Sequence, residues 1–363
     1  MTSIPAGIAV QEPAPVTADK EDRARRQIGA WLLAVAVLIV AMIMLGGLTR
    51  LTQSGLSITE WKPVTGVVPP LSEAAWAAEF AKYKEIPEYR YVHSAFGLAD
   101  FQRIYWWEWS HRLLGRLIGF VFLLPFLHFL AARKIPKSLV PRLAVLFVLG
   151  GLQGALGWFM VRSGLSVRTD VSQYRLAAHL AAAFVIYGAV LWTAFDLLRP
   201  EAMRTAAPGR ARSYALTLIG LVGLQIIAGA FVAGLDAGLI YNSWPLMNGS
   251  IVPHEAWALS PWYLNPFENP AMAQAVHRFI AYAVLALSVF LVFDARRRFG
   301  KGAPAYRSAH IVAGLIGVQV LLGITTLLLV VPLPLAALHQ LTAALVFAAA
   351  LFHAHGLFQA RPR

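Results

Sequence analysis

Eight long apolar segments limit what this 363-residue sequence can fold into. Each is close to the ~20 residues that a helix needs to cross the hydrocarbon core of a bilayer. Charged residues make up only 13% of the chain, whereas a soluble domain usually carries about a quarter. The sequence therefore predicts an all-α polytopic membrane protein with eight transmembrane helices. The segments fall at 27–48, 108–131, 141–161, 175–197, 213–233, 271–293, 307–331 and 335–356.

The basic residues predict the direction of each helix. They gather before the first segment, after the second, fourth and sixth segments, and in the tail at Arg361 and Arg363, whereas the loop 234–270 has no Lys or Arg. Cytoplasmic loops carry an excess of Lys and Arg, so both termini are expected in the cytoplasm. This distribution also accounts for the net charge of +13 without nucleic acid as a partner.

The chain has no cysteine, which excludes disulfides, thiolate metal sites, iron–sulfur clusters and covalently attached c-type haem. Residues 1–26 are polar and rich in Pro and Ala, and the apolar run that follows is long enough to span. We therefore expect a cytoplasmic tail over 1–26 and an uncleaved first helix. Segment 72–84 has helical spacing of apolar residues and is expected to lie along the outer surface.

The two halves of the sequence repeat each other, and each contains four of the eight segments. Because four is an even number, both halves have the same orientation, which predicts two four-helix bundles related by a pseudo-twofold axis along the membrane normal. The N-terminal half covers 27–200 and the C-terminal half 201–363. The matching residues are Gly46, Gly55, Trp61, Gly66 and Pro70 with Gly229, Gly238, Trp244, Gly249 and Pro253, and later Gln153 and Gly157 with Gln319 and Gly323.

Four histidines occupy matching positions in the repeat, near the outer ends of four predicted helices. His111 matches His277, and His179 matches His339. A neutral imidazole is a ligand for haem iron, and two imidazoles facing each other in a helix bundle can hold a haem by both faces. The pattern predicts two haem sites, whereas a single such histidine could equally be structural. The other six lack this symmetry: His93, His128, His254, His310, His353 and His355.

The halves differ three residues before the first histidine of each pair. Glu108 precedes His111, whereas Gln274 precedes His277. Residues three apart share a helix face, so the carboxylate is expected to point towards the same cavity as the imidazole. An ionisable residue at the membrane edge is a functional candidate, although it could also be solvated there. The difference favours chemistry in the first half and a permanent redox cofactor in the second.

Polar residues near these positions have two interpretations each. Arginine binds carboxylates through two hydrogen bonds, so Arg50, Arg112, Arg116 and Arg278 could bind haem propionates or could anchor the helices at the interface. Glutamines recur in three other helices among Gly and Ala, where helix backbones can approach closely. Interhelical hydrogen bonding is their expected role. They are Gln153, Gln225 and Gln319.

Three strings in the first half resemble the haem A synthase family, and the resemblance extends over nearly the whole chain. They are GGLTRLTQSGLSITEWKPVTGVVPP (46–70), EFAKYKEIPEYR (79–90) and WWEWSHRLLGR (106–116). The family consists of eight-helix membrane proteins with two four-helix halves. The resemblance implies oxidation of the C8 methyl of haem O to a formyl group, through a hydroxymethyl intermediate, to give haem A for terminal oxidases. Because it has no cysteine, the chain resembles the α-proteobacterial and mitochondrial branch of this family.

The resemblance also implies roles for single residues. A haem b cofactor is expected between His277 and His339, near Arg278, and substrate haem between His111 and His179, near Arg112 and Arg50. Glu108, His111 and His179 are then the catalytic candidates, with Glu108 positioning water or shuttling protons.

Several questions stay open at the level of the sequence. Oxidation could use oxygen activated on the substrate iron, or electron removal followed by attack of water. The electron partner and the oligomeric state are open, as are contacts with haem O synthase and oxidase assembly factors. The expected location is the bacterial inner membrane. The main alternative is a dihaem b-type electron-transfer cytochrome, and a transporter built on repeated halves is a weaker one.

Overall fold

The computed structural model describes residues 16–358, and the regular secondary structure of that range is helical, with no β-strand. Eight of its helices are long and apolar enough to cross a membrane, as the sequence predicts. Residues 1–15 and 359–363, and with them Arg361 and Arg363, lie outside the described residues. The eight helices are α1 (Val16–Leu51), α4 (Leu98–Ala131), α5 (Val140–Val161), α6 (Gln173–Leu198), α7 (Gly209–Gly234), α9 (Pro270–Phe299), α10 (Pro304–Leu328) and α11 (Leu333–Gly356).

Helix boundaries differ from the apolar segments in a consistent way. Helix α1 begins at Val16, so residues 16–26 of the predicted tail are helical. Helix α4 begins at Leu98 instead of residue 108, because polar and aromatic residues continue the helix past its apolar part. Helix α10 ends before residue 331, since Val330 and Val331 adopt positive φ angles of 60° and 57°, which a right-handed helix cannot contain.

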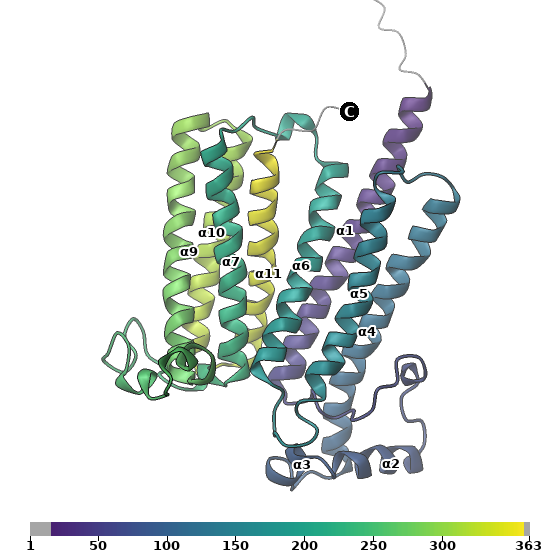
Figure 1. Ribbon diagram of the computed structural model, residues 1–363, viewed down its shortest axis with the longest axis vertical. Coiled ribbons are helices and arrows are strands. Elements are labelled where there is room, and N and C mark those ends of the chain that lie inside the picture. The colour runs from purple at the N-terminus through teal and green to yellow at the C-terminus, as the bar shows by residue number, and fades with distance from the viewer. Residues whose placement is uncertain (1–15, 359–363) are drawn as a thin grey trace, which may run out of the picture.

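The eight long helices contact one another in two groups of four (Figure 1). In the N-terminal group, α1 contacts α4 and α6, and α5 contacts these same two helices. In the C-terminal group, α7 contacts α9 and α11, and α10 contacts these same two. Each group is therefore a closed ring of four helices. The groups meet where α6 contacts α7 and α11, and where α1 contacts α11.

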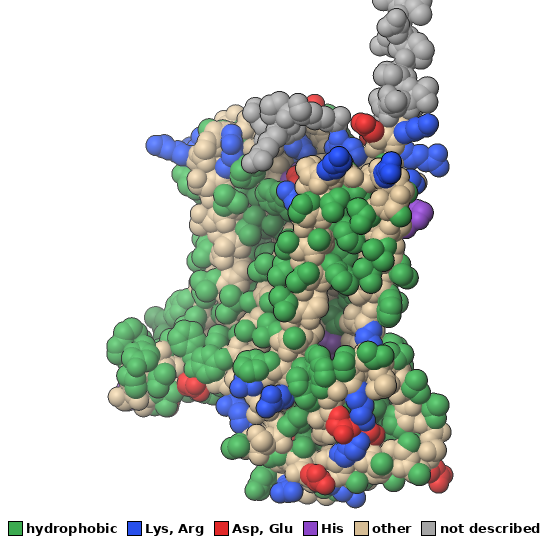
Figure 2. All heavy atoms as spheres, turned by 45° about the vertical axis from the view of Figure 1, so that its right-hand side comes forward, with side chains coloured by type: hydrophobic (Ala, Val, Ile, Leu, Met, Phe, Trp, Pro, Cys, Tyr) green, Lys and Arg blue, Asp and Glu red, His purple; other side chains and the backbone are tan. Residues whose placement is uncertain are grey.

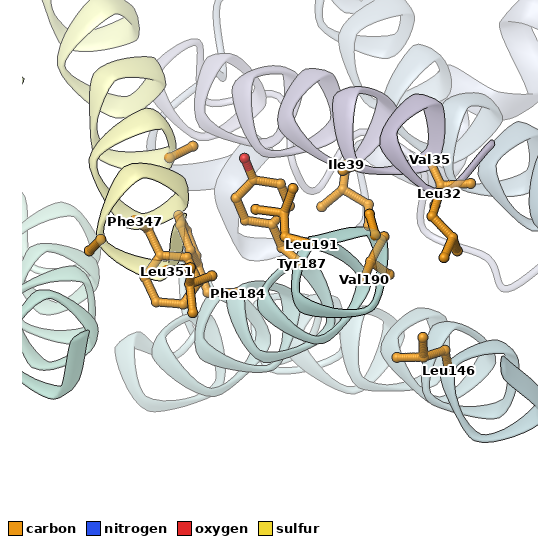
Figure 3. Close-up of a cluster of buried hydrophobic side chains, with 14 of the residues drawn as sticks. Leu32, Val35, Ile39, Leu146, Phe184, Tyr187, Val190, Leu191, Phe347 and Leu351 are labelled. Atoms are coloured by element: carbon orange, nitrogen blue, oxygen red, sulfur yellow. The ribbon is translucent and has the colours of Figure 1, made fainter. Parts of the chain in front are cut away.

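One apolar core runs through both groups. Figure 3 shows side chains of α6 between α1 and α11, with Phe184 and Tyr187 beside Phe347. The rings of Phe184 and Phe347 lie 5.3 Å apart in an edge-to-face arrangement, and Gly188 provides the space for the Phe347 ring. Because lipid is as apolar as these side chains, close packing and dispersion hold the groups together, not burial from water.

Polar contacts join the two groups at both ends of the bundle. Arg50 at the end of α1 forms a 3.0 Å ion pair with Asp236, which follows α7. At the opposite end, His355 of α11 lies 3.1 Å from the carboxylate of Asp196 on α6, which also pairs with Arg142. His355 is thus part of the contact between the groups.

The link between α1 and α4 folds over one end of the N-terminal group. We call residues 52–97 the cap, and the end of the bundle on which it lies the cap end. It contains α2 (Glu73–Tyr83), which runs across the ends of the long helices, and α3 (Pro87–Tyr91) (Figure 1). The Ser72 hydroxyl accepts a hydrogen bond from the Ala75 amide at 3.2 Å and caps α2. The amphipathic helix predicted over 72–84 is therefore present.

A chain of hydrogen bonds holds the inside of the cap together. The Tyr83 hydroxyl donates to the Glu88 carboxyl at 3.0 Å and lies 2.7 Å from Nδ1 of His93. Nε2 of His93 lies 3.3 Å from the amide oxygen of Gln53. Burial raises the pKa of Glu88 to about 8, so this carboxyl is largely protonated in the closed cap at neutral pH.

We expect the stability of the cap to fall as the pH rises. The closed cap keeps the Glu88 proton up to pH about 8, whereas an opened cap releases it near the ordinary pKa of 4.5. Raising the pH from about 5 to about 8 should therefore favour opening, with no further effect above that range. Hydrogen exchange of the amides of 73–93, corrected for intrinsic rates, measures this slope. Glu88→Gln should abolish the slope, and an unchanged slope would assign it to another group.

Candidate functional site

Each of the four predicted histidines lies against a glycine on a neighbouring helix. An added Cβ at the glycine would approach the imidazole Cε1 to about 3 Å, closer than side chains normally pack. The distances are 2.9 Å for Gly46 and His111, 2.9 Å for Gly157 and His179, 3.1 Å for Gly229 and His277, and 2.9 Å for Gly323 and His339. The same arrangement therefore occurs four times, and it explains why these glycines recur in the sequence repeat.

The histidines form two pairs, one in each helix group. His111 on α4 lies within electrostatic reach of His179 on α6, and His277 on α9 lies within reach of His339 on α11. All four side chains are partly buried. The structure thus places the two histidines of each predicted pair in the same four-helix group.

Glutamines contact three of the four imidazoles across helix boundaries. The interhelical hydrogen bonding predicted for these glutamines is confirmed, but its partners are the histidines, which the surrounding Gly and Ala residues do not indicate. Each glutamine lies one turn before the glycine that contacts the same ring. The amide nitrogen of Gln153 lies 3.1 Å from Nδ1 of His179, and that of Gln319 lies 3.4 Å from Nε2 of His339. The amide nitrogen of Gln225 lies 3.1 Å from Nε2 and 3.2 Å from Nδ1 of His277.

These residues fit a haem held by two imidazoles. Iron bound at one ring nitrogen leaves the proton on the other nitrogen, which then needs an oriented acceptor. The amide oxygens of Gln153, Gln225 and Gln319 are all buried without a hydrogen-bond partner in the described part of the chain. A turned amide supplies such an acceptor, and the glycines let the rings fit between the helices.

Glu108 is tied to the cap. Its carboxylate accepts four hydrogen bonds: from the amide of Ile58 at 2.7 Å, from the hydroxyl of Ser57 at 2.8 Å, and from two nitrogens of Arg112 at 3.1 and 2.6 Å. The side chain is only 4% exposed. The sequence predicts that this carboxylate points towards the same cavity as the His111 ring, and among residues 16–358 its hydrogen bonds go to the cap and to Arg112 and not to that ring. Four donors around two oxygens suit a carboxylate anion.

The matching glutamine in the C-terminal group has the opposite hydrogen-bonding role. Gln274 donates to the carbonyls of Ala237 at 2.7 Å and Ile240 at 2.6 Å, and accepts from Arg278 at 2.8 Å. The loop beside Glu108 offers an amide and a hydroxyl, whereas the loop beside Gln274 offers carbonyls. The Glu-to-Gln difference therefore matches the local loop, in addition to any role in chemistry.

The four arginines differ in how many of their nitrogens are already bonded. Arg112 uses all three for Glu108 and for backbone carbonyls of the cap. Arg50 and Arg278 each have a buried Nε without a partner in the described chain, and Arg116 has such an atom at Nη1. Unpaired buried N–H groups of this kind suit an anionic ligand.

Comparison with known proteins identifies the family. A family model described as "Cytochrome oxidase assembly protein" matches residues 29–351. A protein named "Heme A synthase" from Parvibaculum lavamentivorans is 52% identical, over 77% of this chain and 80% of its own length. Proteins with the same name from Azorhizobium caulinodans (52% identical, covering 85% and 86%) and Rhodospirillum centenum (50% identical, covering 82% and 78%) agree. The chain belongs to the haem A synthase family.

Membership in the haem A synthase family confirms the resemblance stated from the sequence, and it does not favour the dihaem electron-transfer cytochrome. With the eight apolar helices, it makes this chain a multi-pass membrane protein. The named relatives are mostly α-proteobacterial, in line with the cysteine-free branch.

A glycine substitution on α10 tests whether the histidine contacts serve a haem. Gly323→Ala should displace His339 and weaken haem binding at the C-terminal site about tenfold or more, because Cβ would lie 2.9 Å from its ring. Gly317→Ala on the same helix is the matched control, since an added Cβ there meets nothing within 4 Å. Pyridine haemochrome spectra of the purified variants give haem per chain. Equal haem content in the two variants would contradict a role for this contact.

Proposed function

We propose that this protein oxidises the C8 methyl group of haem O to the formyl group of haem A, for use by terminal oxidases. The observation that carries the proposal is its 52% identity to proteins named "Heme A synthase" over most of both chains. The four histidine–glycine contacts, two in each helix group, support it because they give each group a candidate haem site with the same residue types. One can hold the substrate and the other a resident haem.

The asymmetry between the groups supports an assignment of the two places. We assign substrate haem to His111 and His179. Three residues before His111 stands the carboxylate of Glu108, whereas the matching position in the C-terminal group has an amide. We assign haem b to His277 and His339, where an amide stands instead. When bound, haem b supplies one-electron redox chemistry, with a potential set by its ligands and their hydrogen bonds.

Arginines with unpaired nitrogens support a second part of the assignment. Arg50 in the N-terminal group and Arg278 in the C-terminal group each have a buried, unpartnered Nε that suits a propionate. Arg112 has none, because its nitrogens bind Glu108 and the cap. In this proposal Arg112 positions Glu108 instead of binding the substrate directly.

The proposed role of Glu108 is to handle protons and water beside the reacting methyl group. Oxidation proceeds twice, through an alcohol to a gem-diol, and loss of water gives the aldehyde. Each oxidation removes two electrons from the substrate, taken up by activated oxygen or by the electron partner, and moves protons to or from the site. A carboxylate held by Arg112 and by the amide of Ile58 is fixed in position to accept or relay these protons.

The distribution of charge supports an orientation in the membrane. On the face shown in Figure 2, Lys and Arg side chains lie across the end of the bundle opposite the cap. We propose that this end faces the cytoplasm, with both termini, and that the cap end faces outwards from the bacterial inner membrane. A pseudo-twofold axis along the membrane normal would then relate the groups. Haem O synthase and oxidase assembly factors are proposed partners.

Extraction of the bound haems tests the function. Purified protein from cells that also express a haem O synthase should yield haem B together with haem O, its alcohol or haem A. Acid-acetone extraction and chromatography identify them. Haem B alone, at two per chain, would support the dihaem cytochrome and refute the synthase.

Replacement of Glu108 tests its role. Glu108→Gln should lower haem A formation about 100-fold while haem O still binds, since proton transfer by a positioned group contributes roughly 10²–10⁴ in rate. Ser57→Ala is the control, because it removes one donor to Glu108 and leaves the carboxylate in place. The ratio of haem O, alcohol and haem A measures both. If Glu108→Gln formed haem A at the full rate, Glu108 would have no role in catalysis and would only anchor the cap.

A further inference from the structure

One of the four histidines lacks the glutamine partner that the other three have. The glutamines that contact His179, His277 and His339 each precede the neighbouring glycine by one helical turn. On α1, Gly46 contacts His111 in the same way, but the residue one turn earlier is Met42. Between residues 16 and 358, no hydrogen bond reaches either ring nitrogen of His111.

Met42 and Gln225 occupy equivalent positions of the sequence repeat, so the two groups differ here in the side chain. Gly46 corresponds to Gly229, and Met42 therefore corresponds to Gln225. The Met42 methyl group lies near Gly115, at 3.5 Å from the Cβ that an alanine would place there, on the helix that carries His111. Met42 thus stands beside the His111 helix, where the other three sites have an amide.

The two side chains act differently on a neighbouring imidazole. A glutamine amide can donate to or accept from a ring nitrogen, which fixes the orientation of the ring. A methionine thioether has no donor, is a weak acceptor and has a flexible side chain. Partners of metal-bound imidazoles are typically worth ~10–100-fold in metal affinity. Of these two restraints His111 has only the glycine contact, whereas the other three rings have both.

We propose that Met42 makes His111 the yielding ligand, so that the His111–iron bond is the one that breaks when substrate haem enters and product haem leaves. This inference rests on the proposed function, in which the haem of the N-terminal group is a substrate that must exchange and the haem of the C-terminal group is a cofactor that must stay bound. His179, fixed by Gln153, holds the iron during exchange. In the C-terminal group, both His277 and His339 have glutamine partners, which suits a haem that remains bound. Met42 is a positioning residue, because it acts through His111.

Three single variants of the full-length protein test the role of Met42. Met42→Gln supplies the missing amide, Gln225→Met removes its counterpart in the C-terminal group, and Met42→Leu keeps an apolar side chain of similar size without sulfur. The first readout is carbon monoxide binding to the dithionite-reduced protein, since only a haem with a yielding ligand binds it readily. The second is the rate of haem transfer to apomyoglobin, with chromatography of the transferred haem.

The expected changes are opposite in the two groups. Met42→Gln should slow haem transfer from the N-terminal site about 10–100-fold and lower its carbon monoxide binding to match. Gln225→Met should make the C-terminal haem bind carbon monoxide and leave faster. Met42→Leu should behave as the unmodified protein, because it adds no hydrogen bond.

Two results would overturn the proposal. One is unchanged haem transfer and carbon monoxide binding in Met42→Gln, and the other is a Met42→Leu variant that behaves like Met42→Gln, which would place the effect in the sulfur. If Met42→Gln does not fold, Gln225→Met alone decides, and a C-terminal haem that still excludes carbon monoxide refutes the role of the amide. The test does not need turnover, because haem B in both sites reports ligand exchange even if the synthase activity is absent.

Discussion

The contact between a histidine and a glycine on the next helix is the constraint on which the two candidate sites depend. It occurs between α1 and α4, α5 and α6, α7 and α9, and α10 and α11. In lipid, helices associate through close packing, and small residues allow the closest approach. The glycine removes the only side-chain atom that would collide with the ring. Each imidazole is thereby set between two backbones at one end of its bundle.

The cap extends this constraint to the surface of the protein. Glu108 and Arg112 lie on the helix that carries His111 and bind Ser57, Ile58 and the backbone of the cap. A movement of the cap therefore reaches the His111 helix through charged hydrogen bonds. The C-terminal group has a similar connection through Gln274 and Arg278, but without a formal charge at the acceptor. Within residues 16–358, only the N-terminal group combines a buried carboxylate, a cap and a candidate histidine without a glutamine contact.

Much of this arrangement could be predicted from the sequence, because the length of apolar segments and the spacing of a repeat are visible there. The eight helices, the four histidines and their glycines follow from these two features. Helix ends could not be predicted well, since helices such as α4 continue beyond the hydrocarbon with polar and aromatic residues. The partners of Glu108 were also hidden, because Ser57 and Ile58 lie in a loop whose path no periodicity describes. The glutamine contacts left a signal that could have been used: a Gln one turn before a repeated Gly in three helices out of four.

The aromatic core between α6 and α11 has a consequence for communication between the two groups. Phe184, Tyr187 and Phe347 interlock across the boundary, and polar contacts at both ends prevent the groups from tilting apart. The separation of the two candidate sites is therefore fixed by the fold. Under the proposed assignment of a haem to each site, the rate of electron transfer between them would depend on the difference in their reduction potentials and on the intervening side chains, and it would not require a hinge or domain rotation.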